Sequence, residues 1–237
     1  NSFESCTKLK KVEFEPNSEL QIIDRMSFMD SSIEKIIIPR HVTTIKDYAF
    51  QNCNNLRIFK IEQNSDLKII EQEAFSSSSL ESIFIPRQVT KITKGAFKYC
   101  KNLKTVEIPI NSKLEEFEED AFTYSSIEFV RIPFSVKKIG ISSFSSCKKL
   151  KKVVIPANSQ LNAIMKYAFF DTSIESFFVP PSLRSLEFRS FSNCKKLLII
   201  EFNENCSLNE IIPTQFVESG NSLIMIAAKL KNRIKII

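Results

Sequence analysis

Apolar and polar residues alternate along this chain in short runs that recur at regular intervals. In the run from Leu103 to Asn111, the apolar residues Leu103, Val106 and Ile108 are separated by polar ones. Apolar residues at alternating positions predict a short strand that buries one face. The same frame occurs at residues 9–17, 56–64, 150–158 and 197–205, and a shorter form begins at Ile33, Leu80, Ile127 and Ile174.

A second pattern, x-x-V-x-x-I-x-x-x-A-F, lies between the predicted strands, for example from Val89 to Phe97. It predicts short extended or helical segments on the side opposite the strands. Every copy ends in phenylalanine, and we expect these rings to stack as a continuous spine. The ten phenylalanines are Phe3, Phe28, Phe50, Phe75, Phe97, Phe122, Phe144, Phe169, Phe191 and Phe216.

The intervals between these phenylalanines alternate strictly between 25 and 22 residues. Cys6, Cys53, Cys100, Cys147 and Cys194 recur every 47 residues, which is one long repeat plus one short repeat. A period of 20 to 50 residues is typical of a solenoid, in which each repeat buries its apolar face against its neighbours. We therefore expect one domain over residues 1–237, with an irregular terminal repeat at about 217–237.

The combined pattern A-F-x-x-C-x-x-L-x-x-V-x-I-P resembles the BspA-like leucine-rich repeats, also called the Treponema pallidum type. The resemblance extends from Phe3 to about Ile226. It implies an α/β repeat solenoid: a right-handed superhelix with a parallel concave sheet of about ten strands and short extended or helical convex segments. Such repeats occur mainly in surface or secreted proteins of host-associated bacteria and anaerobic protists. The resemblance thus implies adhesion or host interaction, without assigning any binding residue.

The regular cysteines do not predict disulfides or a metal site. Equivalent positions in successive long repeats are two strands apart, which is roughly 10 Å at the usual strand spacing. A disulfide needs Cα atoms within about 7 Å, and a zinc site needs ligands that converge on one point. We therefore expect buried free thiols that pack as small apolar groups.

The sequence offers little for catalysis. His41 is the only histidine, and the repeat frame places it in a turn. With three glycines in the chain, no phosphate-binding loop is available. We expect no enzyme activity, no catalytic residue, no cofactor and no metal.

Composition is that of a foldable chain, with 43% hydrophobic and 25% charged residues and a net charge of +6. No apolar run approaches the roughly 18 residues that span a bilayer, so we expect no membrane insertion by this segment. Lysines cluster after the cysteines, as at Lys148, Lys149, Lys195 and Lys196. They predict a basic rim that keeps the solenoid soluble, and glycosaminoglycan or nucleic-acid binding is the alternative; of these we expect no nucleic-acid partner.

The outward side chains of the strands form the candidate partner-binding site. Outward positions should be polar if water is their only neighbour, yet several are aliphatic or aromatic. Exposed aromatic residues among arginine and glutamate are typical of a protein-binding surface. The alternative is that they only stabilise an exposed sheet through cross-strand contacts. The candidate residues are Ile37, Lys60, Phe84, Glu107, Phe129, Arg131, Val154 and Phe178.

These observations predict a non-enzymatic recognition module whose concave face binds a protein or acidic glycan on a host cell, matrix or other microbe. The expected location is the cell surface or the secreted fraction. The alternative is a cytoplasmic scaffold in a cytoskeletal or signalling assembly. Self-association through an open solenoid end is a further expectation. Asn205, the last residue of the frame at 197–205, begins an N-glycosylation sequon, but we expect this asparagine to be buried and unmodified.

Overall fold

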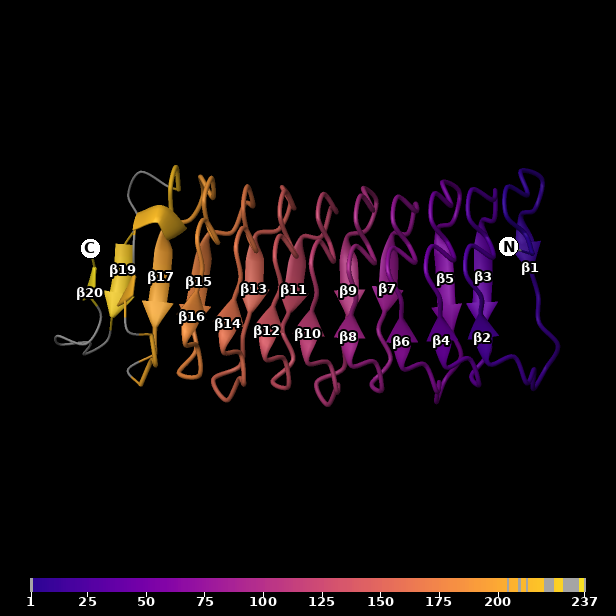
Figure 1. Ribbon diagram of the computed structural model, residues 1–237, viewed down its shortest axis with the longest axis horizontal. Helices are drawn as coiled ribbons and strands as arrows, with labels where there is room; N and C mark the ends of the chain where they lie inside the picture. The colour runs from indigo at the N-terminus through magenta and orange to yellow at the C-terminus, as the bar shows by residue number, and fades with distance from the viewer. Residues whose placement is uncertain are drawn as a thin grey trace.

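The protein is a solenoid of parallel strands whose repeats lie side by side along one axis (Figure 1). The computed structural model describes residues 2–203, 205–208, 210–211, 213–219, 224–227 and 235–236. Most of the expected irregular terminal repeat therefore lies outside the described residues. The N-terminal strand β1 and the C-terminal strands β19 and β20 lie at opposite ends of the array.

Each coil contributes a strand from the leucine frame, which we call a frame strand. The frame strands are β1 (Lys11–Val12), β3 (Lys35–Ile38), β5 (Ile58–Ile61), β7 (Ser82–Phe84), β9 (Thr105–Glu107), β11 (Phe129–Arg131), β13 (Lys152–Val154), β15 (Ser176–Val179), β17 (Ile199–Phe202) and β19 (Ile224–Ala227). Six of them end just before Pro39, Pro86, Pro109, Pro133, Pro156 or Pro180. Proline lacks the N–H that a longer ladder would need, so these strands are short.

A second strand of two residues lies on the other side of each coil, and we call these the convex strands. They form one eight-stranded parallel sheet: β2 (Ile22–Ile23), β4 (Thr44–Ile45), β6 (Ile69–Ile70), β8 (Lys91–Ile92), β10 (Glu116–Phe117), β12 (Lys138–Ile139), β14 (Ala163–Ile164) and β16 (Ser185–Leu186). Near the C-terminus, β18 (Glu210–Ile211) pairs with β20 (Lys235–Ile236), and η1 (Pro213–Gln215) is a 3-10 helix.

The frame strands are grouped in pairs, which Figure 1 shows as unequal gaps between neighbours. Each short-repeat strand is hydrogen-bonded to the following long-repeat strand over three or four residues, as in β3–β5 and β7–β9. The next junction is weaker: β9–β11 and β13–β15 share one registered position each, and β5–β7 share none. The last described junction, β17–β19, again has four.

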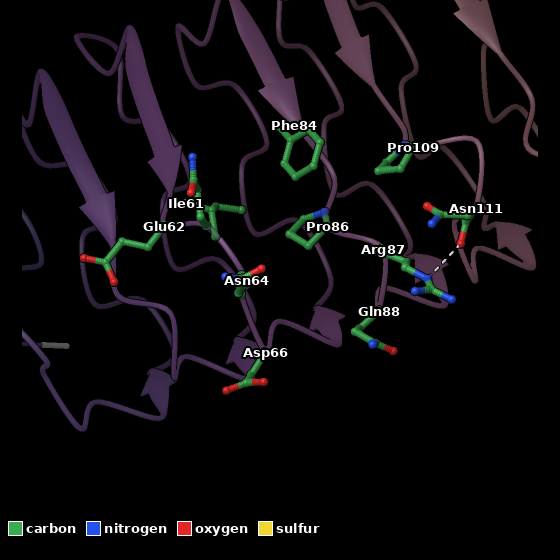
Figure 2. Close-up of a pocket in the computed structure, with 12 residues that line it drawn as sticks. Ile61, Glu62, Asn64, Asp66, Phe84, Pro86, Arg87, Gln88, Pro109 and Asn111 are labelled. Atoms are coloured by element: carbon green, nitrogen blue, oxygen red, sulfur yellow. Dashed lines mark hydrogen bonds between the residues drawn. The ribbon is translucent and has the colours of Figure 1, made fainter.

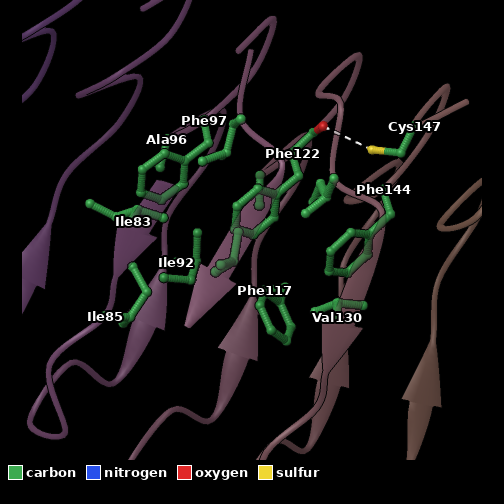
Figure 3. Close-up of a cluster of buried hydrophobic side chains, with 14 of the residues drawn as sticks. Ile83, Ile85, Ile92, Ala96, Phe97, Phe117, Phe122, Val130, Phe144 and Cys147 are labelled. Atoms are coloured by element: carbon green, nitrogen blue, oxygen red, sulfur yellow. Dashed lines mark hydrogen bonds between the residues drawn. The ribbon is translucent and has the colours of Figure 1, made fainter. Parts of the chain in front are cut away.

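The phenylalanine spine is confirmed. All nine consecutive ring pairs from Phe3 to Phe216 are stacked, with centroids 5.0–5.7 Å apart. Figure 3 shows Phe97, Phe122 and Phe144 in this row beside the aliphatic residues of the strands. Because each ring contacts the rings before and after it, the spine joins the coils into one continuous core.

Two parts of the expected fold need correction. The convex segments are extended strands and turns, and the 3-10 helix η1 is the single helical element in the described part of the chain, so the α/β class and the helical segments are not confirmed. The single concave sheet of about ten strands is not confirmed either, because the frame strands divide into a three-stranded and a seven-stranded sheet. The division follows from the unpaired junction between β5 and β7.

The asparagine at the end of each frame is exposed and does not fill the interior of its turn. Asn64, Asn111 and Asn205 are exposed, so the expectation of a buried Asn205 is wrong. The neighbouring serine closes the turn instead: the N–H of Leu67 donates to Ser65 Oγ at 3.1 Å. The same bond forms at Leu114 and Leu161. Serine hydroxyls commonly satisfy local backbone groups in this way.

Candidate partner-binding site

The outward side chains of the frame strands form one surface, the frame face. The strand register places Ile37 beside Lys60, Phe84 beside Glu107, Arg131 beside Val154, and Phe178 beside Glu201. Phe129 lies in the adjacent column, between Thr105 and Lys152. The predicted column is therefore correctly placed on the strands, while its role in binding stays a prediction.

The candidate residues differ in how far they are exposed. Ile37, Phe84 and Phe129 have 42%, 47% and 40% of their surface accessible, which is high for apolar side chains. Val154 and Phe178 are half-buried, and Phe178 packs against the core. The strongest apolar candidates for contact with a partner are therefore Ile37, Phe84 and Phe129.

Phe84 lies beside an open groove at the interruption between β5 and β7. The groove has a volume of about 710 Å³ and extends from Ile61 and Glu62 past Pro86 toward Asn111. Figure 2 shows Phe84 and Pro86 between the loop that carries Asn64 and the loop that carries Asn111. A smaller cavity of about 240 Å³ lies over the same junction, between Lys60 and Glu107. Two hollows thus meet the exposed ring of Phe84.

Backbone hydrogen bonds explain why the face is open here. Before each frame strand, an N–H normally donates to the carbonyl of the preceding coil, as Arg57 does to Glu34 and Lys104 to Glu81. The equivalent bond from Glu81 to the carbonyl of Arg57 is absent, although both residues are in the described part. The two coils are therefore held together by their cores and turns, and β5 and β7 belong to different sheets.

Polar side chains along the groove hold one another in place. Arg40 Nε donates to His41 Nε2 at 3.0 Å, and His41 Nδ1 lies 3.3 Å from Asp66 Oδ2. Glu62 accepts the N–H of Arg40 at 3.0 Å, and Arg87 Nε donates to the carbonyl of Asn111. Both ring nitrogens of His41 have partners, so the histidine orients the loop, and it lies in a turn as predicted.

The structure also shows a second apolar site, which the alternation along the strands does not predict. Ile110 is 80% exposed, and it lines a cavity of about 120 Å³ together with Ile108, Phe134 and three prolines. Its position in the repeat is occupied by Gln63 in the previous long repeat. An aliphatic residue where another copy has an amide is a signal that alignment of the repeats could have found.

The cysteines form a buried series with its own hydrogen bonds. Cys53, Cys100, Cys147 and Cys194 are free and buried. Each thiol donates to the carbonyl oxygen of the phenylalanine in the preceding coil at 3.0–3.1 Å. Burial raises the pKa of Cys100 and Cys147 to about 12. These thiols are unreactive structural groups.

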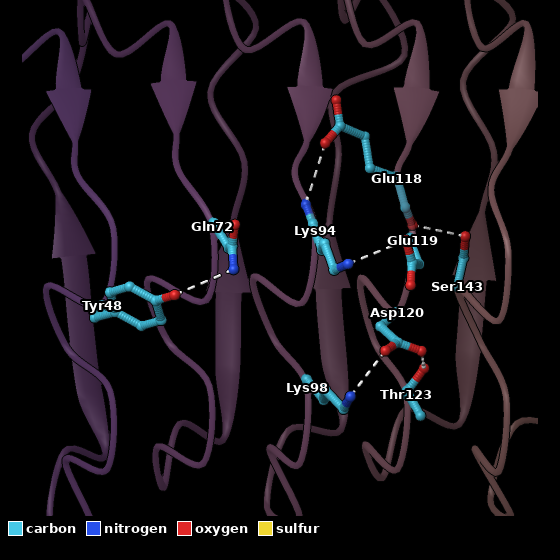
Figure 4. Close-up of polar contacts among 9 residues, drawn as sticks. All are labelled: Tyr48, Gln72, Lys94, Lys98, Glu118, Glu119, Asp120, Thr123 and Ser143. Atoms are coloured by element: carbon cyan, nitrogen blue, oxygen red, sulfur yellow. Dashed lines mark hydrogen bonds and ion pairs between the residues drawn. The ribbon is translucent and has the colours of Figure 1, made fainter.

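Charge pairs are concentrated on the convex sheet. At the first frame strands, Lys10 pairs with Glu34 at 3.1 Å and Lys11 pairs with Glu13. On the convex side, Glu116 lies between Lys91 and Lys138, at 3.5 and 2.9 Å. Figure 4 shows further pairs there, including Lys94 with Glu119 and Lys98 with Asp120. The convex surface is therefore locally neutralised.

Within the part of the chain that the structure describes, no three histidine, cysteine or acidic side chains gather as metal ligands would. The described residues also include no helix of the length and apolarity that crosses a membrane.

The profile of the BspA type leucine-rich repeat region matches residues 1–104, 68–198 and 115–232, with 6 copies of the repeat. This chain belongs to that family. Members are typically non-enzymatic, protein-binding surface proteins. A search among curated proteins finds no match.

One solved structure supports the fold, and others are similar in sequence. A leucine-rich repeat protein from Bacteroides ovatus aligns with a TM-score of 0.54 at 20% identity, over 92% of this chain and 70% of that one. A leucine-rich cell surface protein from Faecalibacterium prausnitzii is 21% identical over 86% of this chain and 79% of its own, with a TM-score of 0.42. The Treponema pallidum leucine-rich repeat protein is 18% identical over 81% of this chain and 70% of its own, with a TM-score of 0.39.

Proposed function

We propose that this protein is a recognition module that binds a protein partner through its frame face and catalyses no reaction. The observation that carries the proposal is the exposed ring of Phe84 beside the groove at the β5–β7 interruption. A partner side chain can enter the groove while Phe84 supplies the apolar contact, which is the usual arrangement of an interface anchor. Lys60 and Glu107 flank the ring with opposite charges and favour one orientation of the partner.

The setting we propose is adhesion or host interaction at a cell surface or in the secreted fraction. Support comes from the membership of the BspA-type family, whose proteins are typically at the surface. The partner would then be a protein on a host cell, in the matrix or on another microbe. A cytoplasmic scaffold is the competing role, and fractionation of the source cells followed by immunodetection distinguishes the two.

The test of the frame face uses the double variant Phe84→Ala/Phe129→Ala. Phe178 is left intact because it packs against the core and its loss would destabilise the fold. The matched control is Ile22→Ala/Ile69→Ala, since these residues are 44% and 45% exposed on the opposite, convex sheet. Wild type and both variants are immobilised and exposed to extracts of host cells and matrix, and bound proteins are identified by mass spectrometry.

The expected result is one or more partners that the wild type and the control retain and the double variant loses. The loss should be about tenfold or more in affinity, because two anchors each contribute on the order of 1–2 kcal/mol. Circular dichroism must show that all three proteins are folded. Equal capture by the wild type and the folded double variant would show that the frame face is not the binding site.

A further inference from the structure

Long repeats differ from short ones by a turn that precedes the frame strand. The sequence Cys-x-x-Leu forms this turn, and the N–H of the leucine donates to the cysteine carbonyl at 2.9–3.1 Å in all five long repeats. Short repeats have one residue fewer between the equivalent positions, as in Ser78-Ser79-Leu80. The two central residues of the long turn are exposed, so the extra residue creates a projecting knuckle on every second coil.

The knuckles become basic toward the C-terminal end of the solenoid. Their central pairs are Thr7-Lys8, Asn54-Asn55, Lys101-Asn102, Lys148-Lys149 and Lys195-Lys196. Lys151 and Lys152 follow the fourth knuckle and are also exposed. The last two knuckles and Lys151 form what we call the lysine edge, while Lys152 belongs to the frame face beside Phe129. Because equivalent knuckles are two strands apart, its lysine pairs recur at roughly 10 Å.

The lysine edge is not neutralised by the protein itself. Lys148 is paired with Asp171 at 3.4 Å, but no carboxylate among the described residues lies within ion-pair distance of Lys149, Lys195 or Lys196. The lysines of the convex sheet behave differently, since Lys91 and Lys138 are both paired with glutamates. The lysine edge therefore carries a cluster of uncompensated positive charge, which attracts an external anion.

Hydrogen bonds hold the knuckle backbone, so the points from which the lysine side chains project are fixed. Besides the turn hydrogen bond from Leu150 to Cys147, the hydroxyl of Ser173 donates to the carbonyl of Lys148 at 2.7 Å. In the next long repeat, the N–H of Lys195 donates to the carbonyl of Asn193 at 3.0 Å. Two lysine pairs at a fixed repeat along the solenoid axis match a linear polymer better than a single small anion.

We infer that the lysine edge binds a sulfated linear polysaccharide, independently of the frame face. The spacing of charged groups along the polymer distinguishes a sulfated polysaccharide from a nucleic acid as the ligand of the lysine edge. Glu128 and Glu175 lie in the coils on either side of Lys151, so carboxylates interrupt the basic row. A DNA duplex presents a charge about every 1.7 Å and would place phosphates against these carboxylates. A sulfated polysaccharide need not carry a sulfate on every sugar, so its sulfates can meet the lysines and avoid these carboxylates.

Single-stranded nucleic acid is also a poor match for this edge. Proteins that bind it without sequence preference provide aromatic side chains on which bases stack. The projecting residues of these two knuckles are lysines alone: Lys148, Lys149, Lys195 and Lys196. Their ammonium groups supply charge without the planar surface that a base requires.

The experiment measures the affinity of the protein for a heparin oligosaccharide by titration calorimetry at about 50 mM and about 200 mM salt. The test variant is Lys149→Gln/Lys195→Gln/Lys196→Gln. The control is Lys68→Gln/Lys113→Gln/Lys166→Gln, which removes three exposed lysines that lie away from the knuckles and also have no ion pair in the described part. Both variants lower the net charge equally. Desulfated heparin and single-stranded DNA of the same length serve as comparison ligands.

Heparin should bind the wild type, and added salt should weaken the complex. The test variant should lose about tenfold or more in affinity at low salt, while the control stays within about twofold. Absence of heparin binding, equal loss in both variants, or equal affinity for the desulfated polymer would overturn the inference. Tighter binding of DNA than of heparin would assign the edge to nucleic acid instead. Capture of a protein partner by the frame face should be unchanged in the test variant, so the two proposals can fail separately.

Discussion

The thiol of Cys147 donates a hydrogen bond of 3.1 Å to the carbonyl oxygen of Phe122 in the preceding coil (Figure 3). The hydroxyl of Ser125 lies 3.3 Å from the same sulfur. Serine or threonine therefore alternates with cysteine along this column, and each cysteine contacts the hydroxyl of the coil before it. This alternation explains the 47-residue period of the cysteines. In every second coil, a thiol joins neighbouring coils through a weak hydrogen bond.

The buried thiols make stability depend on alkaline pH. Burial raises the pKa of Cys100 and Cys147 to about 12 and that of Cys53 and Cys194 to about 11, from 9.0. The unfolded chain loses these protons near pH 9, while the folded chain keeps them. Above that pH the unfolded state binds fewer protons, so the free energy of unfolding should fall as pH rises toward 11 and 12, and should be at its full value below 9.

Urea unfolding between pH 7 and about pH 11 measures this dependence, followed by circular dichroism. The double variant Cys100→Ser/Cys147→Ser is the control, because serine occupies the equivalent position in the short repeats and does not titrate in this range. It should show a shallower decline than the wild type. A wild-type stability that is constant from pH 8 to 11 would contradict the assignment.

The phenylalanine spine should dominate stability. Phe122 is fully buried and stacks on Phe97 at 5.1 Å and on Phe144 at 5.4 Å. Phe122→Ala should lower the free energy of unfolding by about 3–5 kcal/mol, because it leaves a cavity and removes contacts with two coils. Phe84→Ala, on the exposed face, should cost less than about 1 kcal/mol. Thermal unfolding of both variants compares them, and equal effects would contradict the assignment of spine and surface.

Much of this fold could be predicted from the sequence because the repeat is nearly exact. The 25- and 22-residue intervals are enough to predict the phenylalanine spine, and the prolines are enough to predict where the strands end. The interruption between β5 and β7 could not be predicted, since it depends on whether the N–H of Glu81 reaches the carbonyl of Arg57, and the pattern of apolar residues says nothing about that backbone bond. The helical alternative failed for a similar reason: short apolar segments suit both a helix turn and a two-residue strand.

Gly140 is required by the close approach of a neighbouring backbone. A Cβ built there would lie 2.6 Å from the carbonyl oxygen of Phe117 and 2.8 Å from the carbonyl carbon of Glu118. The same Phe117 oxygen accepts the N–H of Gly140 at 2.7 Å, so the two coils cannot separate without losing this bond. Gly140→Ala should therefore lower the free energy of unfolding by about 1–3 kcal/mol.

Gly95→Ala is the comparison for Gly140→Ala in urea unfolding. Gly95 has a φ of 62°, and its added Cβ would lie 2.9 Å from Cγ of Glu73, whose side chain can shift. Its cost should be about 1 kcal/mol, from the left-handed conformation alone. A larger effect at Gly95 than at Gly140 would show that backbone conformation outweighs the contact between coils.

The candidate site was predicted only in part. Alternation along the strands correctly placed Phe84 and Phe129 outward, but it could not show that Phe178 leans onto the core, which depends on side chains of adjacent coils. The convex ion pairs were missed because the partners are 22 to 25 residues apart, as are Lys91, Glu116 and Lys138. Alignment of the repeats by their phenylalanines places these three residues in one row, so the signal was present in the sequence.

Glu116 should contribute more to stability than its exposed neighbour Glu115. Lys91 and Lys138 approach Glu116 from the coils on either side, whereas among the described residues Glu115 pairs with Lys137 alone. Glu116 is 20% exposed and Glu115 is 54% exposed, so solvent screens the second pair more. Glu116→Gln should cost about 0.5–1 kcal/mol and Glu115→Gln less, since exposed pairs contribute little.

Added salt distinguishes an electrostatic contribution of Glu116 to stability from a contribution of packing. In about 1 M NaCl the Debye length falls to about 3 Å, so the difference between Glu116→Gln and wild type should shrink. Glutamine keeps the size of the side chain and removes only the charge, which makes it the suitable substitution. Urea unfolding at low and high salt measures both values. If Glu116→Gln destabilises equally under the two conditions, Glu116 joins the coils by packing and hydrogen bonding, and its position between two lysines adds nothing to the cohesion of the solenoid.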